Sequence, residues 1–265
     1  MIRGIYTGCS GMLVQLTRTD VVANNLANAN TVGFKREETI FRAHPQHSIV
    51  RVNDLTPSSL KDFLLPIKGA PFVGRLGTAS VVDETYIESS LGPLIPTGNP
   101  LDLALRDEGT FFVLQDSKGN RYYTRAGSFT INSQGNVVSQ SGHILLSEGG
   151  PINVPEGSRI TFAEDGRFFI NGEEGGTLLI VRFQKPTYLK RIGSNLYAET
   201  KDSGSPIPQE NINLEVGALE GSNVSPVKEM VHLIEAHRAY EMNQRMVLTQ
   251  DETLERAITN LTRVA

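Results

Sequence analysis

Hydrophobic and small residues repeat at alternating steps of three and four near both ends of the chain. This spacing predicts two α-helices with narrow apolar seams, as in coiled coils, whereas a surface helix of a globular domain carries a wider stripe. A narrow seam needs a partner helix, which we expect to be the other terminal helix or another copy of the chain. The seam positions are Ile2, Ile5, Cys9, Met12, Leu16, Thr19, Ala23 and Leu26, followed near the C-terminus by Met230, Leu233, His237, Tyr240, Gln244, Val247, Asp251, Leu254, Ile258 and Leu261.

The N-terminal helix is expected to span residues 2 to about 29. It contains Gly4, Gly8 and Gly11, and each glycine costs roughly 0.5–1 kcal/mol of helix stability relative to alanine. Two interpretations are open. Either the glycines allow a close backbone approach to another helix, or the first turns are frayed or partly non-helical.

Asparagines gather where this helix should end, with four of them in the seven residues 24–30. Asparagine accepts the left-handed conformation and hydrogen-bonds to nearby backbone, so it is typical of helix ends and turns. An ordinary polar helix end needs fewer. We therefore expect a side-chain network that fixes the angle between the terminal helix and the rest of the chain. Its members are Asn24, Asn25, Asn28, Thr31, Gly33, which permits positive φ, and Phe34, which offers an apolar anchor.

The C-terminal helix has clear start signals. Ser225 is a candidate N-cap, Pro226 suits the first helical position, and the Glu229 carboxylate in the first turn favours the helix dipole. The helix should run from 226 to about 262, roughly 55 Å at ~1.5 Å per residue. A column of three polar residues in its seam either selects the helix register or faces solvent at the seam edge. These residues are His237, Gln244 and Asp251.

Between the helices, residues 44–80 are irregular and contain four prolines, so they predict an extended connector with short strands. From about 81 to 200, short apolar runs alternate with turn residues and predict an antiparallel β domain. The run 177–183 is more continuously apolar and predicts a more buried strand, and 201–211 reads as a return linker. Three hairpins are expected, at 111–114 with 121–124, at 128–131 with 137–138, and at 160–162 with 167–170.

These elements predict an α+β fold. Long N- and C-terminal helices would pair as a coiled coil, with a central antiparallel, Gly-rich β domain between them in sequence. The expected division places the N-terminal helix in residues 1–35, the connector in 36–80, the β domain in 81–212, and the return segment with the C-terminal helix in 213–265.

Composition narrows the possible functions. The 265 residues carry a net charge of −4 with thinly spread Lys and Arg, which argues against a nucleic-acid partner. The single cysteine excludes an internal disulfide framework and a cysteine-based zinc site. Without a run of 18 apolar residues, no transmembrane helix is expected. The N-terminal residues are too mixed in polarity for a secretory signal, so we expect no cleaved signal peptide.

No catalytic constellation is visible. His44 and His47 lie three apart around a proline, and a metal site would need further ligands, so solvated loop histidines are the simpler interpretation. The acidic pairs at 164–165 and 173–174 lie in predicted turns, where carboxylates are usually solvated. A nucleophile elbow and a phosphate-binding glycine loop are both missing from the sequence. We therefore expect no catalytic residue, cofactor or metal, and no enzyme activity.

Four stretches carry a family resemblance. They read ANNLANANTVGFKR at 23–36, TGNPLDLAL at 97–105, YTRAGSF at 123–129, and LEGSNV at 219–224 with RAYE at 238–241. In this order, and over nearly the whole chain, they resemble the bacterial flagellar basal-body rod and hook proteins. The chain is most similar to the proximal-rod (FlgF-like) and distal-rod (FlgG-like) subgroup. The short spacer and the wording at 98–102 favour the proximal rod.

The resemblance implies a structural subunit that transmits torque from motor to hook. In this family the terminal helices pair and line the innermost tube, while the β domain faces outward and subunits repeat on a helical lattice. The implied partners are copies of the chain, other rod or hook subunits, and the flagellar type III export apparatus, with surrounding ring proteins as further candidates. The implied location is the basal body in the cell envelope and periplasmic space. Monomer ends would fold on assembly.

Two alternatives belong to other classes. A coiled-coil-stalked β binding module, such as an adhesin, would form a small closed oligomer in solution, whereas a rod subunit would be a monomer with loose ends. A cell-wall hydrolase would need a cleft lined by carboxylates, and the sequence pattern does not indicate one.

Overall fold

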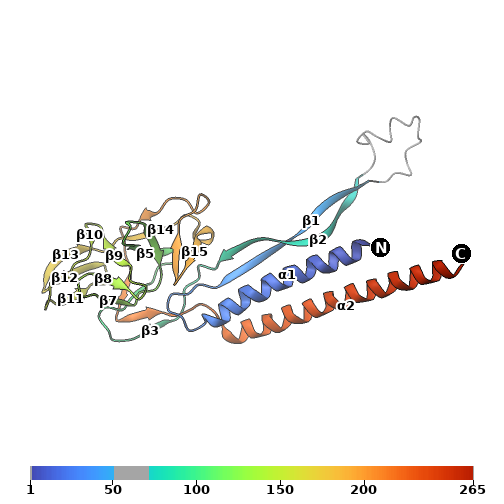
Figure 1. Ribbon diagram of the computed structural model, residues 1–265. Helices are drawn as coiled ribbons and strands as arrows, with labels where there is room; N and C mark the ends of the chain where they lie inside the picture. Colours follow the sequence, from blue (N-terminus) through green and yellow to red (C-terminus); the bar gives the residue numbers. More distant parts are fainter. Residues whose placement is uncertain (1, 51–71, 265) are drawn as a thin grey trace. The chain divides into compact units, whose positions relative to one another are not determined.

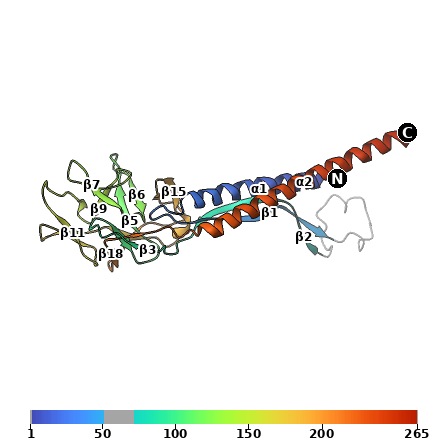
Figure 2. The ribbon, with the colours of Figure 1, turned by 90° about the horizontal axis from the view of Figure 1, so that it is seen from below.

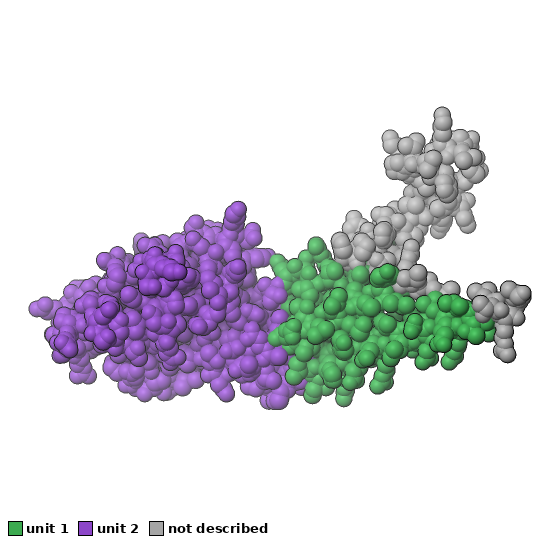
Figure 3. Space-filling view, viewed as in Figure 1, with its two compact units in different colours: residues 1–20, 39–84, 233–265 green, residues 21–38, 85–232 purple. Residues whose placement is uncertain are grey.

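The computed structural model describes residues 2–50 and 72–264 and has an α+β fold (Figure 1). Helix α1 (Ile2–Ala27) and helix α2 (Pro226–Val264) stand at the two ends of the chain, and an antiparallel β domain lies between them in sequence. The chain forms two compact units (Figure 3). We call residues 1–20, 39–84 and 233–265 the helical unit, and residues 21–38 and 85–232 the β unit.

Both helices form close to where the sequence predicts them. α1 ends two residues before the predicted 29 and is followed by a turn, as the asparagines there favour. α2 begins at Pro226 as predicted, and the backbone N–H of Glu229 donates to the carbonyl of Ser225 at 3.0 Å. Glycines in the first turns of α1 do not stop it from being helical from Ile2 onward.

Two long strands replace much of the predicted irregular connector. Strands β1 (Glu37–Val50) and β2 (Phe72–Ile87) pair in a two-stranded sheet (Figures 1 and 2). β2 contains three valines and two threonines, residues that suit a pleated surface. The prediction of only short strands in this region is therefore wrong, because β1 and β2 have 14 and 16 residues. Residues 51–71, and the side chains of His44 and His47, lie outside the described residues.

All three predicted hairpins are confirmed. Each turn contains a glycine with positive φ, namely Gly119, Gly135 and Gly166, which is the backbone conformation that tight hairpin turns require. The antiparallel pairs are β5 (Thr110–Gln115) with β6 (Arg121–Thr124), β7 (Phe129–Ile131) with β8 (Val137–Ser139), and β11 (Ile160–Phe162) with β12 (Arg167–Ile170).

The largest sheet of the β unit has ten strands in the described residues, with the main order β15-β16-β6-β5-β9-β8-β7. The predicted single strand at 177–183 is instead divided, because β13 ends at Thr177 and β14 starts at Ile180. The remaining elements are β3 (Leu94–Pro96), β4 (Leu103–Leu105), β9 (Ile144–Ser147), β10 (Gly150–Pro151), β13 (Glu173–Thr177), β14 (Ile180–Arg182), the short 3-10 helix η1 (Pro186–Tyr188), β15 (Lys190–Gly193), β16 (Leu196–Ala198), β17 (Ile207–Pro208), β18 (Leu214–Val216) and β19 (Ala218–Glu220).

Strand β5 is buried on both faces and lies between two hydrophobic clusters. Phe112 and Leu114 join one cluster, while Phe111 and Val113 join the other, as the period of two along a strand requires. In the second cluster the ring of Phe111 meets that of Tyr197 edge to face, with centroids 5.6 Å apart. These clusters give the β unit a core of its own.

Candidate functional site at the ends of the terminal helices

The three glycines of α1 face α2, which runs antiparallel beside it in the helical unit (Figures 1 and 2). A Cβ atom at Gly8 would lie 2.6 Å from Cγ2 of Val247, closer than real Cβ contacts occur. Of the two interpretations of these glycines, the structure therefore favours close approach. The residues nearest to a Cβ at Gly4, Gly8 and Gly11 are Gln250, Val247 and Asn243, respectively.

The side of α2 nearest α1 is not quite the predicted seam. The less exposed residues of α2 still recur at steps of three and four. One column belongs to both the predicted seam and the observed face, namely Leu233, Tyr240, Val247 and Leu254. The second column of the observed face differs from that of the predicted seam, because the glycines of α1 let the two helix backbones approach each other over a neighbouring column of α2. The observed second column is Ala236, Asn243, Gln250 and Ala257, whereas the predicted column of Met230, His237, Gln244, Asp251 and Ile258 is exposed in the single chain.

The polar column His237, Gln244 and Asp251 is thus not brought to α1. The three side chains are exposed, and the imidazole of His237 pairs with Glu241 on the same helix at 3.4 Å. Their influence on register stays a prediction about contacts with other chains.

The face of α1 that contacts α2 likewise lies one residue before the predicted seam. Gly4, Gly8 and Gly11 occupy it, whereas the seam prediction named Ile5, Cys9 and Met12. Among the predicted seam residues, Leu16 and Ala23 are exposed, while Ile5, Cys9, Met12, Thr19 and Leu26 are half-buried. The side chains of Ile2 and Leu261 lie outside the described residues. An ion pair between Arg18 and Glu235, at 3.6 Å, adds a polar contact between the two helices.

In the β unit, Asn25 links the end of α1 to the start of β1. Its Oδ1 accepts from the backbone N–H of Glu37 at 2.9 Å, and its Nδ2 donates to the carbonyl of Glu37 at 2.8 Å. The same Nδ2 donates to Oε2 of Glu229 at 3.4 Å. Asn25 is 1% exposed, and its side chain imitates the backbone pairing of a strand.

The other asparagines of the motif act locally. Nδ2 of Asn28 donates to Oδ1 of Asn24 at 2.8 Å, and the hydroxyl of Thr31 donates to Oδ1 of Asn28 at 3.2 Å. These bonds hold the turn that follows α1.

Gly33 and Phe34 fix the chain against the β unit. Gly33 has φ +66°, and a Cβ there would lie 2.4 Å from the backbone nitrogen of Ala126, so no other residue fits without displacing the backbone. Its N–H donates to the carbonyl of Glu220 at 2.8 Å. The ring of Phe34 is buried, and the Arg191 guanidinium lies 4.3 Å from its centroid, a cation–π contact.

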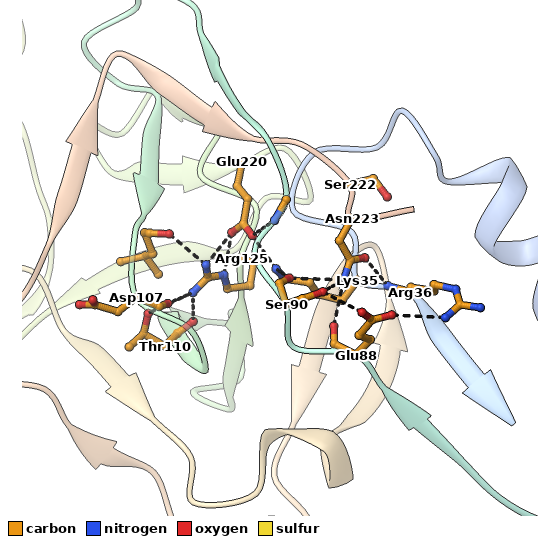
Figure 4. Close-up of polar contacts among 12 residues, drawn as sticks. Lys35, Arg36, Glu88, Ser90, Asp107, Thr110, Arg125, Glu220, Ser222 and Asn223 are labelled. Atoms are coloured by element: carbon orange, nitrogen blue, oxygen red, sulfur yellow. Dashed lines mark hydrogen bonds and ion pairs between the residues drawn. The ribbon is translucent and has the colours of Figure 1, made fainter. Parts of the chain in front are cut away.

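Lys35, the residue directly after this motif, forms a buried ionic triad with Arg125 and Glu220 (Figure 4). One oxygen of Glu220 is 2.5 Å from Nζ of Lys35, and the other accepts from Nε of Arg125 at 2.7 Å. The three side chains are between 0% and 4% exposed. The remaining guanidinium N–H groups of Arg125 donate to the carbonyls of Leu105, Asp107 and Thr110, so the buried cation is satisfied.

The two cations keep the shared carboxylate ionised. Burial alone would raise the pKa of Glu220, but the charges of Arg125 and Lys35 outweigh it and hold the pKa below its ordinary value. Burial lowers the pKa of Lys35, and attraction to Glu220 offsets this only in part because Arg125 repels the ammonium. Such a cluster joins segments of the chain. Its three charged groups are paired with one another and buried, so the arrangement supports a structural role.

Sequence reasoning named the uncharged members of the motif and gave Glu229 only a helix-dipole role. It assigned no network role to Lys35, Arg125, Glu220 or Asn223. A usable signal was present, because Lys35, Arg125 and Glu220 are charged residues beside small or apolar neighbours in three of the four family-like stretches. The fourth stretch, 97–105, forms a loop that leads into β4, and in this loop the hydroxyl of Thr97 donates to Asp102 at 2.7 Å.

Among the residues that the structure describes, no group of His, Cys, Asp or Glu is arranged to hold a metal ion. None of the described helices is both long and apolar enough to span a membrane.

Comparison with known proteins decides the family. Flagellar basal-body rod protein FlgG of Bacillus subtilis is 32% identical over 271 residues, which covers 97% of this chain and 98% of that protein. FlgF of Caulobacter vibrioides is 34% identical over 266 residues, and the alignment covers 100% of both chains. FlgG of the same species is also 34% identical, over 96% of this chain and 97% of the relative.

The chain belongs to the flagellar basal-body rod protein family.

Three family descriptions match parts of this rod-family chain. They are "Flagella basal body rod protein" at 5–35, "Flagellar hook protein FlgE/F/G D1 domain" at 107–170 and "Flagellar basal body rod FlgEFG protein C-terminal" at 215–261. Lys35, Arg125 and Glu220 fall in one match each, so the triad joins all three. The resemblance seen in the sequence is confirmed. As a member of this family, the chain is a structural protein of the flagellar basal body and not an enzyme.

Proposed function

We propose that the chain is an axial subunit of the flagellar rod that polymerises helically through its terminal helices and transmits torque from motor to hook. The observation that carries the proposal is the apolar surface left open on both helices. Tyr6 and Leu13 on α1 are 69% and 66% exposed, and Ile234 and Met242 on α2 are 54% and 64% exposed. Large apolar side chains repeated along a helix are typical of surfaces that other chains cover.

In this proposal α1 and α2 pair as a coiled coil, and their outward faces contact neighbouring copies or other rod and hook subunits. The shared seam positions Leu233, Tyr240, Val247 and Leu254, together with the close approach at Gly8, support pairing. The exposed column His237, Gln244 and Asp251 would then meet adjacent subunits, where polar residues select register. The motif residues that end α1 would hold the helix in its assembled direction.

We place the subunit in the proximal, FlgF-like rod rather than in the distal rod. The support is the short spacer and the wording at 98–102, and the alignment with Caulobacter FlgF runs over 266 residues and the full length of both chains. The chain would reach the envelope through the flagellar type III export apparatus, without a cleaved signal peptide, and would lie within the periplasmic rings.

A charge on the open helix faces tests the proposal. Leu13→Asp and Met242→Asp should abolish rods in cells that lack the wild-type chain, because a carboxylate would be buried in the assembly. Thr130→Asp introduces the same charge at an exposed position of β7 and should leave rods and swimming intact. Circular dichroism of each purified chain checks that folding is retained.

Cryo-EM of isolated basal bodies supplies the readout and the position along the rod. Rods of normal length in both helix variants would refute polymerisation through these faces. Replacing His237, Gln244 and Asp251 together by Leu should alter or abolish assembly, and normal motility would refute their role in register. A purified chain that forms a small closed oligomer would instead support the stalked binding module.

A further inference from the structure

Four segments pass between the β unit and the helical unit, and the β unit holds all four with one group of polar side chains. The chain passes from one unit to the other after residues 20, 38, 84 and 232. Within the β unit these segments are the end of α1, the start of β1, the residues just after β2, and the first turns of α2. We call Asn25, Arg36, Glu88, Asn223 and Glu229 the exit cluster.

The carboxylate of Glu229 is the acceptor that joins three of these segments. Oε1 accepts from Nε of Arg36 at 2.8 Å, and Oε2 accepts from Nδ2 of Asn25 at 3.4 Å. Glu229 is 1% exposed although it stands in the first turn of a helix, where carboxylates usually meet solvent. Burying a charge is costly unless it is paired and hydrogen-bonded, so this arrangement is specific for a carboxylate.

Asn223 connects the remaining segment (Figure 4). Its Oδ1 accepts from the backbone N–H of Arg36 at 2.7 Å, and its Nδ2 donates to the carbonyl of Glu88 at 3.1 Å. The guanidinium of Arg36 also pairs with the carboxylate of Glu88 at 3.3 Å. Arg36 therefore receives contacts from the residues after β2 and from the first turn of α2 at once.

We infer that Glu229 is a positioning residue that couples the four segments where they leave the β unit. In a Glu229→Gln variant the charge is lost and one carboxylate oxygen becomes an NH₂ group, so Arg36 and Asn25 can no longer both donate to this side chain. Each segment can then fluctuate on its own. The core of the β unit does not include these residues, so it should stay folded. In the proposed rod subunit this cluster would pass torque from the helices to the β unit. The inference concerns the single chain and is tested without rods.

The experiment compares Glu229→Gln with the wild type by hydrogen–deuterium exchange of the purified full-length chain. Exchange of the backbone amides of Arg36 and Glu37, and of the segments 21–27, 85–90 and 226–232, should rise together by at least about tenfold, because local opening no longer breaks a charge-assisted bond. Exchange in β5 and β9 should not change.

Glu215→Gln is the matched control, since Glu215 pairs with Arg106 at an exposed position of the same unit. It should leave all these amides unchanged. Arg36→Lys keeps the charge but loses the fork that reaches two carboxylates, and it should reproduce the coupled loss if Glu229→Gln does not fold. Faster exchange in the first turn of α2 alone would overturn the inference and reduce Glu229 to a helix-end charge. Equal acceleration in β5 would also overturn it, because the effect would then be global destabilisation.

Discussion

Replacing Glu220 by glutamine tests how much of the stability of the β unit depends on the buried triad. The carboxylate accepts from Nζ of Lys35 and the backbone N–H of Gly92 through one oxygen, and from Arg125 through the other. Glutamine has nearly the same volume but is neutral, and its NH₂ group must face donors on one side. Both cations then remain buried without an anion.

The magnitude follows from the geometry. Each charge-assisted hydrogen bond lost is worth about 1.5–3 kcal/mol net, and at least two are lost on the side of the new NH₂. Breaking a buried ion pair by removing one partner typically costs about 3–5 kcal/mol. Lys35, Arg125 and Glu220 are all at most 4% exposed, so solvent screening does not reduce the effect. We expect Glu220→Gln to lower the free energy of unfolding of the β unit by about 3–5 kcal/mol.

Urea unfolding at pH 7, followed by near-UV circular dichroism, measures this loss. The chain has no tryptophan, and five of its seven tyrosines (Tyr86, Tyr122, Tyr123, Tyr188 and Tyr197) belong to the β unit, so the signal reports mainly on that unit.

Two further variants sharpen the measurement. Glu215→Gln removes an exposed ion pair and should cost less than about 1 kcal/mol. Lys35→Met should cost less than Glu220→Gln, because Arg125 keeps its acceptor. If Glu220→Gln costs no more than Glu215→Gln, the reasoning about the triad is refuted.

Three other predictions concern backbone space and charge. Gly33→Ala should destabilise the β unit by at least ~1 kcal/mol, because φ is positive and the new Cβ meets the backbone nitrogen of Ala126, and thermal melting measures it. Gly8→Leu should weaken the contact with α2 at Val247 by about 1–3 kcal/mol, although leucine has the better helix propensity. Circular dichroism on heating should show the loss of helicity at a lower temperature, and an unchanged melting curve would contradict the close approach. Because its pKa is lowered in the fold, Glu220 contributes stability that is fully present above its ordinary pKa of 4.5 and is lost as the pH falls below that value through the lower folded-state pKa. Wild-type urea midpoints should therefore drop steeply in that acid range and those of Glu220→Gln less steeply, and parallel pH profiles would count against the triad.

The candidate site was predictable only where its chemistry is local. The asparagines at 24–30 indicate a turn because their side chains bond to neighbouring backbone, and Asn28 does so with Asn24. The buried position of Asn25 depends on Glu229, 204 residues away. Lys35, likewise, is an ordinary surface residue by type, and only Glu220, 185 residues away, makes its burial possible.

The sequence by itself determined the elements whose signals are short-range. Pro226 starts α2, and glycines with positive φ close the three hairpins, because these residues restrict or release their own backbone. The tertiary structure alone decided which column of each helix faces the other, because the glycine column of α1 lets the backbones approach closest even though a more apolar column stands beside it. It also decided which charges are buried, since an ion can leave water only where distant segments bring its partners.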